Sequence, residues 1–287
     1  MLTLASPSKL NLFLEVLGKR PDGFHELDTV MLRTQFCDML SARPNDSGRL
    51  TLRFSDATVP AVTAGVPLDD RNLILKAAAA LQECCQVRAG VDFVLHKQIP
   101  PQSGLGGGSG NAATALLACR QIWNLTVSDH VLHTIAASLG SDINFLLAGC
   151  RAAVCRSRGE RIEPFSLGAQ LFFLAFRPQQ GNSTPEIFRH TQLPVAPRSS
   201  APLVAVLTAG QTIELPQFCF NRLTAAAAQL NPAMADLIAR LERITRKSVW
   251  MSGSGSTVFL SCRSEPHMQQ LYRQLLEERI SGWMLRV

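Results

Sequence analysis

The sequence has no long hydrophobic run and no paired cysteine motif. None of its apolar stretches approaches the roughly 18 uninterrupted apolar residues of a membrane helix. The opening residues, MLTLASPSKLNLFLEV, lack the basic region and the apolar core of a targeting segment. The eight cysteines are scattered without a C-x-x-C pair. We therefore expect a soluble cytoplasmic protein with reduced thiols, and neither a disulfide framework nor a zinc site.

Charge of one sign is not concentrated anywhere either. The net charge is +6, but lysine and arginine are spread along the chain and form no arginine-rich run. This distribution favours a mild attraction for anions over a nucleic-acid surface, so we expect no nucleic-acid or membrane partner. A hydrophobic fraction of 46% and a charged fraction of 17% are typical of a globular protein, and 287 residues suffice for two domains.

The motifs of the most familiar nucleotide-binding proteins are also missing. The Walker pattern G-x-x-x-x-G-K-[ST] does not occur, because LGKR at residues 17–20 lacks the first glycine. The Rossmann pattern G-x-G-x-x-G fails because registers that start at Gly104 and Gly106 end on Ser109 and Asn111. Neither H-R-D nor D-F-G is present, which excludes the protein-kinase pattern.

What the sequence does have is a cluster of five glycines in the seven residues 104–110, within SGLGGGSGN. A strand-like segment precedes it, and Asn111 with an alanine-rich, helix-like run follows it. Glycines let the backbone approach an anion closely, and a helix N-terminus favours negative charge. A flexible linker is the alternative, but this context favours a polyphosphate-binding loop.

Strand-like and helix-like segments follow one another in mixed order. Apolar patterns predict strands at residues 9–17 and 90–100 and in QLFFLAF, LVAVL and STVFLSC. Helices are predicted in NLILKAAAALQEC, NAATALLACRQIW, SDHVLHTIAASLG, LNPAMADLIARLERI and SEPHMQQLYRQLLEERI, the last two capped by Asn231 and Ser264. Such a mixture predicts an α+β protein.

Two segments are predicted to be long connections, at residues 41–70 and 178–202. The second contains five prolines and lies next to the predicted domain boundary. We expect an N-terminal ATP-binding and catalytic domain over residues 1–165 and a C-terminal domain over residues 166–287.

Four further features carry side chains suited to chemistry. Lys9 and Asn11 fall on the same face of a predicted strand. Phe24 and His25 follow a Pro-Asp-Gly turn, Asp142 precedes an apolar run, and SGSGSTVF is a second glycine-rich and serine-rich turn that enters a strand. Taken singly, each has a structural explanation: a surface lysine, turn and core residues, a helix cap or a hairpin. Their joint occurrence favours function.

In this order the blocks resemble the GHMP kinase superfamily. The first family motif is matched by SPSKLNLFLEV with KRPDGFHEL, the second by PQSGLGGGSGNAATAL and the third by SGSGSTVF. The first block is most similar to members that phosphorylate the 2-hydroxyl of 4-diphosphocytidyl-2-C-methyl-D-erythritol in the non-mevalonate (MEP) isoprenoid pathway. The resemblance implies the two-domain GHMP kinase fold, with an N-terminal ribosomal protein S5 domain 2-like lobe, a C-terminal ferredoxin-like lobe and the active site in the cleft between them.

The resemblance also implies cofactors and residue roles. ATP would act with Mg²⁺, which phosphates and one or two protein oxygens would hold. Lys9 and Asp142 would be catalytic, Asp142 as a base or an orienting carboxylate, which suits the needs of phosphoryl transfer. The ATP-binding residues would be Asn72, Gly104, Leu105, Gly106, Gly107, Gly108, Ser109 and Asn111. Those that bind the cytidyl substrate would be Asn11, Phe24, His25, Lys97 through its backbone, Thr184 and Phe188, with cytosine stacked between the two phenylalanines.

The sequence departs from the family pattern at several positions. Gly110 stands where a second serine is usual, which removes a hydroxyl near phosphate or metal. Phe24 stands where tyrosine is common, and Ser141 and Asn144 replace alanine and proline.

Two alternatives stay open. Instead of a kinase of the cytidyl substrate, the chain could be another small-molecule GHMP kinase or a catalytically silent nucleotide-binding protein on the same fold. The pair of Phe24 and His25 argues for a cytidine nucleotide, and the presence of Lys9 and Asp142 argues against a silent binder.

Overall fold

The computed structural model describes all 287 residues, which divide into two compact units. Each unit is built from separate stretches of chain. The first unit contains Met1–Ser8, Cys37–Pro101 and Gly106–Gly149, and the second contains Lys9–Phe36, Gln102–Leu105 and Cys150–Val287. These units are defined by compactness and are not continuous in sequence, so they do not test the predicted domain boundary between residues 165 and 166, which stays a prediction.

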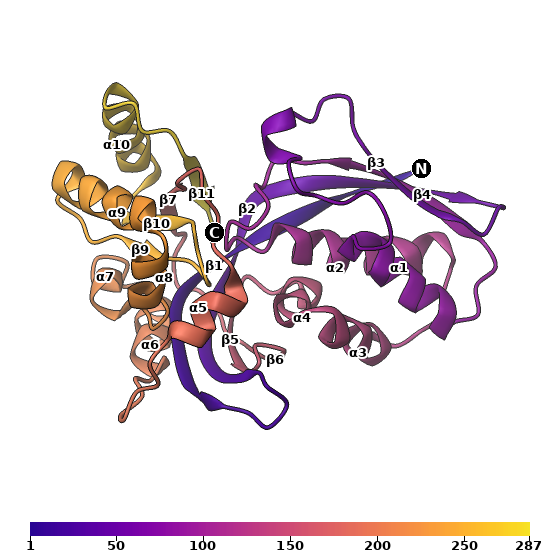
Figure 1. Cartoon of the computed structure of the whole chain (residues 1–287), viewed down its shortest axis with the longest axis horizontal. Coiled ribbons are helices and arrows are strands. Elements are labelled where there is room, and N and C mark those ends of the chain that lie inside the picture. Colours follow the sequence, from indigo (N-terminus) through magenta and orange to yellow (C-terminus); the bar gives the residue numbers. More distant parts are fainter. The chain divides into compact units, whose positions relative to one another are not determined.

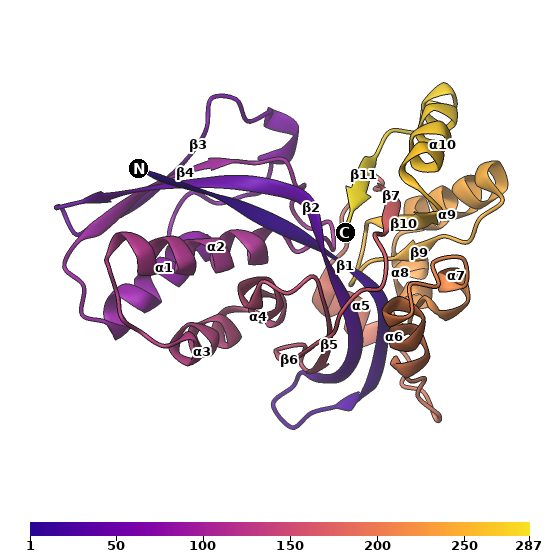
Figure 2. The same ribbon diagram turned by 180° about the vertical axis from the view of Figure 1, so that it is seen from behind.

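Two long strands, β1 (Leu2–Lys19) and β2 (His25–Asn45), contribute residues to both units. In the first unit the end of β2 pairs antiparallel with β4, and β4 pairs parallel with β3. Figures 1 and 2 both show α1 and α2 along one face of these strands. In chain order after β2, the elements of this unit, including those just named, are β3 (Leu50–Phe54), the 3₁₀ helix η1 (Pro60–Val62), α1 (Leu73–Cys84), β4 (Gly90–His96), α2 (Gly107–Ile122), α3 (Asp129–Leu139) and α4 (Ser141–Ala148).

The second unit holds a four-stranded antiparallel sheet in the order β11-β7-β10-β9. Separately, β5 pairs with the start of β2 and with β6, and β8 pairs parallel with β1. The strands of this unit are β5 (Ala152–Ser157), β6 (Arg161–Pro164), β7 (Phe172–Phe176), β8 (Phe220–Asn221), β9 (Trp250–Met251), β10 (Val258–Cys262) and β11 (Trp283–Arg286). Its helices are α5 (Thr184–His190), α6 (Ala201–Thr208), α7 (Leu215–Phe218), α8 (Thr224–Leu230), α9 (Pro232–Thr245) and α10 (Glu265–Glu277).

Local signals account for several element boundaries. The Asn231 side chain accepts a hydrogen bond from the Met234 N–H at 3.2 Å, and Ser264 accepts one from the His267 N–H at 3.4 Å. These contacts satisfy N–H groups that a helix start leaves without an intrahelical partner. Both predicted caps are confirmed, as is the α+β class. None of the helices combines the length and apolarity that a membrane crossing requires.

Three predictions about elements are wrong. LVAVL lies in helix α6 and not in a strand; Pro202 occupies the first turn of α6, and so short an apolar run fits either structure. The connection predicted at 41–70 contains the end of β2, all of β3 and η1. The connection predicted at 178–202 contains α5 and the start of α6. Each of these helices has a proline in its first turn, a position that favours the start of a helix, so the prolines did not indicate a connection.

Candidate active site

The glycine-rich segment ends in an uncapped helix N-terminus. Helix α2 begins at Gly107, and no side chain caps it at Gly106, whose φ of 69° is in the left-handed region. The Gly110 N–H, which donates to the Gly106 oxygen at 2.8 Å, makes the first backbone hydrogen bond of the helix. The N–H groups before it and the helix dipole together suit an anion. The predicted position of the loop at a helix start is confirmed.

Two glycines of this helix lie against other backbone or side-chain atoms. A Cβ at Gly110 would be 2.4 Å from the carbonyl oxygen of Pro7 in β1. A Cβ at Gly107 would be 2.8 Å from the Ile99 side chain and 3.1 Å from Lys97 Nζ. The absence of a serine at position 110 thus accompanies a close approach of helix and strand.

A buried carboxylate, which sequence reasoning missed, organises the surroundings of α2. Asp38 Oδ2 accepts hydrogen bonds from Lys97 Nζ at 2.5 Å and from Asn111 Nδ2 at 2.9 Å. Asp38 Oδ1 accepts from the Gln98 and Ile99 N–H groups at 2.7 and 2.8 Å. Burial lowers the pKa of Lys97, and the charge of Asp38 opposes that shift. The side chains of Lys97 and Asn111 are therefore both bound to Asp38, and they hold the start of α2 in place rather than being free to bind a ligand at its N-terminus.

Two other predicted residues of the first unit lie at helix starts. Asn72 caps α1: its Oδ1 accepts from the Ile74 N–H at 2.9 Å, and its Nδ2 donates to the Pro67 oxygen at 2.6 Å. Asp142 lies in the first turn of α4, for which Gly140 is the cap. The interpretation of Asp142 as the cap itself is wrong; its carboxylate lies in the first turn of α4, where the helix dipole favours negative charge.

In the second unit, Lys9 and Asn11 are both buried and lie together on β1. Lys9 Nζ donates to Asn11 Oδ1 at 2.5 Å, and Asn11 Nδ2 donates to Thr29 Oγ1 at 2.9 Å. The prediction that both residues share one face is confirmed. Lys9 is 3% exposed, so it is not a surface lysine. A buried ammonium requires polar partners, and Asn11 Oδ1 is one of them.

The third glycine-rich block, residues 252–257, joins β9 to β10, as the predicted hairpin requires. Ser252 Oγ donates to the Gly104 oxygen at 3.0 Å and accepts from the Asn11 N–H at 3.1 Å. A Cβ at Gly253 would lie 2.9 Å from Lys9 Nζ. This block therefore connects the strand that carries Lys9 to the first part of the glycine-rich segment, residues 102–105.

The same block contacts the segment that carries Thr184. The hydroxyls of Thr184 and Ser254 are 2.7 Å apart, and Asn182 Nδ2 donates to the Ser254 oxygen at 2.8 Å. Hydroxyl and amide groups, which can both donate hydrogen bonds, are therefore grouped at the 252–257 block.

Cytosine is predicted to stack between the rings of Phe24 and Phe188, and in the structure one of these two rings is stacked on another side chain. The His25 ring stacks on the Phe188 ring, with centroids 4.9 Å apart and planes at 27°. Phe24 is half exposed, and the guanidinium of Arg158 lies 4.7 Å from its ring centroid. Burial, with a smaller effect of Lys19, lowers the pKa of His25 and favours the neutral ring at pH 7.

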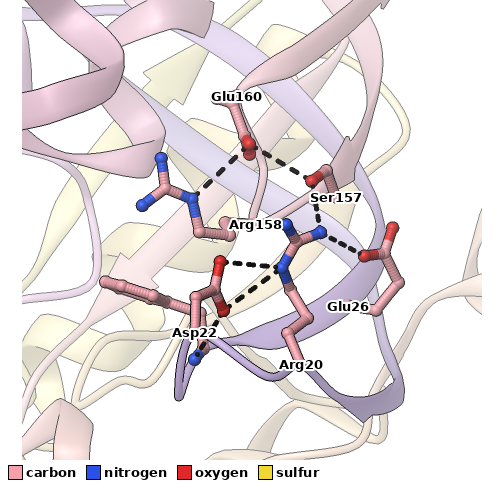
Figure 3. Close-up of polar contacts among 7 residues, drawn as sticks. Arg20, Asp22, Glu26, Ser157, Arg158 and Glu160 are labelled. Atoms are coloured by element: carbon pink, nitrogen blue, oxygen red, sulfur yellow. Dashed lines mark hydrogen bonds and ion pairs between the residues drawn. The ribbon is translucent and has the colours of Figure 1, made fainter.

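A polar network fixes the turn that carries Phe24 (Figure 3). Arg20 Nη1 donates to Glu26 at 2.7 Å and to Ser157 Oγ at 2.8 Å, and Arg20 Nε contacts Asp22 at 3.2 Å. Asp22 in turn accepts from the Phe24 N–H at 3.1 Å. The turn between β1 and β2 is thereby held to the end of β5.

Comparisons with known protein families identify both parts of the chain. The model of the GHMP kinases N terminal domain matches residues 72–149, and that of the GHMP kinases C terminal domain matches residues 210–281. The fold is therefore the two-domain fold of the GHMP kinases, which are ATP-dependent kinases, and this prediction is confirmed.

Two relatives that are more than 30% identical to this chain have the same name. The chain is 34% identical to 4-diphosphocytidyl-2-C-methyl-D-erythritol kinase of Pelotomaculum thermopropionicum, over 90% of this chain and 88% of that protein. It is 38% identical to the Acidovorax sp. protein of that name, over 88% and 85%. A crystal structure of 4-(cytidine 5'-diphospho)-2C-methyl-D-erythritol kinase superposes with a TM-score of 0.79 at 29% identity, over 99% and 98%. The chain therefore belongs to the GHMP kinases and, among them, to the family of these erythritol kinases.

Proposed function

We propose that this chain transfers the γ-phosphoryl group of ATP to the 2-hydroxyl of 4-diphosphocytidyl-2-C-methyl-D-erythritol, a step of the non-mevalonate isoprenoid pathway. One observation carries the proposal. The buried ammonium of Lys9 lies beside Gly253, in a loop whose Ser252 is hydrogen-bonded to Gly104 of the glycine-rich segment. A cation is thus held at a fixed place relative to the start of a phosphate-binding loop, and phosphoryl transfer depends on such positioning.

The chemical roles follow from the side chains. The N–H groups of Gly107, Gly108 and Ser109, at the uncapped start of α2, would bind the ATP phosphates. Lys9 would hold the accepting hydroxyl and stabilise the charge on the transferred phosphoryl group. Asp142 would orient that hydroxyl or receive its proton as the new P–O bond forms and ADP leaves.

We also propose that Mg²⁺ accompanies ATP. The uncapped N-terminus of α2 suits a metal-bound polyphosphate, and the Ser109 hydroxyl in its first turn is a suitable oxygen. The ion would neutralise phosphate charge; Lys9 and the α2 amides would position the phosphates.

The substrate end would use the second group of residues. Cytosine would lie against Phe24 and Phe188, with His25 and the Lys97 backbone at its polar edge. The Lys97 N–H donates to Thr58 Oγ1 at 3.2 Å, so we assign this contact to the Lys97 carbonyl oxygen. Asn11 would contact the methylerythritol part, and Thr184 would lie near the diphosphate. Leu105, Asn72 and Asn111 would contribute to the ATP site, the two asparagines by holding the starts of α1 and α2.

A cytoplasmic location is part of the proposal. All eight cysteines are free thiols, and ATP is the proposed phosphoryl donor. The partner would be a small-molecule substrate.

The test is ADP release from Mg²⁺ and ATP with four acceptors: the diphosphocytidyl methylerythritol, mevalonate, homoserine and galactose. We expect turnover with the cytidyl compound alone. Activity on another acceptor would identify a different small-molecule GHMP kinase and refute the substrate site. Binding of ATP without turnover of any acceptor would identify a catalytically silent binder.

A further inference from the structure

Arg177 is a partly buried arginine of the second unit that has no carboxylate partner. Arg222, for comparison, makes two contacts of 2.7 Å to Glu15. Arg177 directly follows β7, and its Nε donates a long hydrogen bond of 3.4 Å to Ser256 Oγ. Its Nη2 would lie 3.4 Å from a Cβ at Gly181. Burial lowers the pKa of Arg177, and no acidic group counteracts the shift.

A partly buried guanidinium without an anion is energetically unfavourable, so its position indicates an anionic ligand. The neighbours of Arg177 identify the class of anion. Ser256 belongs to the 252–257 loop, which also contacts Lys9 through Gly253. Gly181 lies in the segment that leads to Thr184, whose hydroxyl pairs with Ser254. These neighbours offer hydroxyl and backbone groups, and the planar fork of arginine matches phosphate oxygens.

We infer that Arg177 binds a phosphate group of one of the two nucleotides used in the proposed reaction. This inference rests on the proposed function, and it adds a residue to which no family motif of the sequence points. Two sources supply the same chemistry: the diphosphate of the cytidyl substrate and the phosphates of ATP. Arg177 is therefore a binding residue for a nucleotide phosphate, additional to Lys9 and the α2 amides.

Binding measurements on the full-length protein test this role without turnover. The variants are Arg177→Gln, which removes the charge, and Arg177→Lys, which keeps the charge but loses the fork. Arg273→Gln, at an exposed position of α10, is the matched control. The probes are inorganic pyrophosphate, CDP and a non-hydrolysable ATP analogue, titrated by calorimetry. KM values for both nucleotides are measured in parallel.

We expect Arg177→Gln to weaken binding of one nucleotide by about tenfold, Arg177→Lys to weaken it less, and Arg273→Gln to leave it unchanged. Loss of CDP affinity with a raised substrate KM assigns Arg177 to the diphosphate. Loss of affinity for the ATP analogue with a raised ATP KM assigns it to ATP. Either result supports the inference even if no acceptor is phosphorylated, which would refute only the proposed function.

The opposite result is equally clear. If the variants bind pyrophosphate, CDP and the ATP analogue as the wild type does, the inference is wrong, whether or not the enzyme turns over. A lowered unfolding temperature with unchanged binding would show that Arg177 is only structural. Should Arg177→Gln not fold, the same readouts on Arg177→Lys decide, because loss of the fork alone must then weaken one nucleotide.

Discussion

Ser252 Oγ donates a hydrogen bond of 3.0 Å to the carbonyl oxygen of Gly104. The two residues are 148 positions apart in sequence, and the same hydroxyl accepts from the N–H of Asn11. One serine therefore links the first segment of the phosphate loop to the strand that carries Lys9.

Replacement of Ser252 by alanine should impair both folding and activity. The buried Asn11 N–H would lose its acceptor, which costs about 1–3 kcal/mol of unfolding free energy. We also expect kcat to fall by roughly tenfold, because the position of Lys9 relative to the loop would relax. Denaturant unfolding and steady-state kinetics measure the two effects. Ser281→Ala, at an exposed position, is the control, and a wild-type kcat in Ser252→Ala would contradict the positioning role.

Replacement of Asp142 by asparagine should separate chemistry from ATP binding. The amide keeps the shape of the side chain but neither accepts a proton nor carries charge, so we expect kcat to fall by roughly 10² or more. ATP affinity, measured by calorimetry, should change little. Asp236→Asn changes an exposed carboxylate of α9 and should leave both quantities unchanged. Wild-type turnover in Asp142→Asn would refute the catalytic assignment.

Phe24→Ala should affect only the cytidyl substrate. Loss of an aromatic face is expected to raise the KM of that substrate by about tenfold and to spare the KM of ATP. Phe24→Tyr restores the residue common in the family and should retain the wild-type KM. An equal rise of both KM values in Phe24→Ala would show that Phe24 does not bind the base.

Gly110→Ser should destabilise the protein although serine is usual in the family. A Cβ at this position would lie 2.4 Å from the Pro7 oxygen, so β1 or α2 must shift. We expect a loss of about 1–3 kcal/mol of unfolding free energy, the usual size of an overpacking effect. Gly108→Ala is the matched control, because its Cβ would make only an ordinary contact of 3.6 Å with Leu73. Equal unfolding midpoints for Gly110→Ser, Gly108→Ala and the wild type would show that β1 shifts to accommodate the serine without loss of unfolding free energy.

Much of the architecture was predictable because its signals are local. Asn231 and Ser264 cap helices with hydrogen bonds to N–H groups three residues further along, and such contacts depend on a few neighbouring residues. The face shared by Lys9 and Asn11 follows from the two-residue period of a strand. The short apolar run LVAVL lacks such a signal, and tertiary packing selected a helix for it.

The family motifs located the glycine-rich segment, Lys9 and Asp142, while the contacts proposed for Thr184, Phe188 and the other ligand-binding residues stay predictions. The role of Asp38 was hidden, because its partners Gln98 and Asn111 lie 60 and 73 positions away. The sequence by itself thus determined the family, the helix starts capped by Asn231 and Ser264, and the residues suited to phosphate chemistry, since these depend on local pattern. Tertiary structure alone decided that Asp38 supports the loop, that Ser252 joins Gly104 to β1 and that Arg177 has no acidic partner. Such facts depend on which distant segments meet, and no local pattern encodes them.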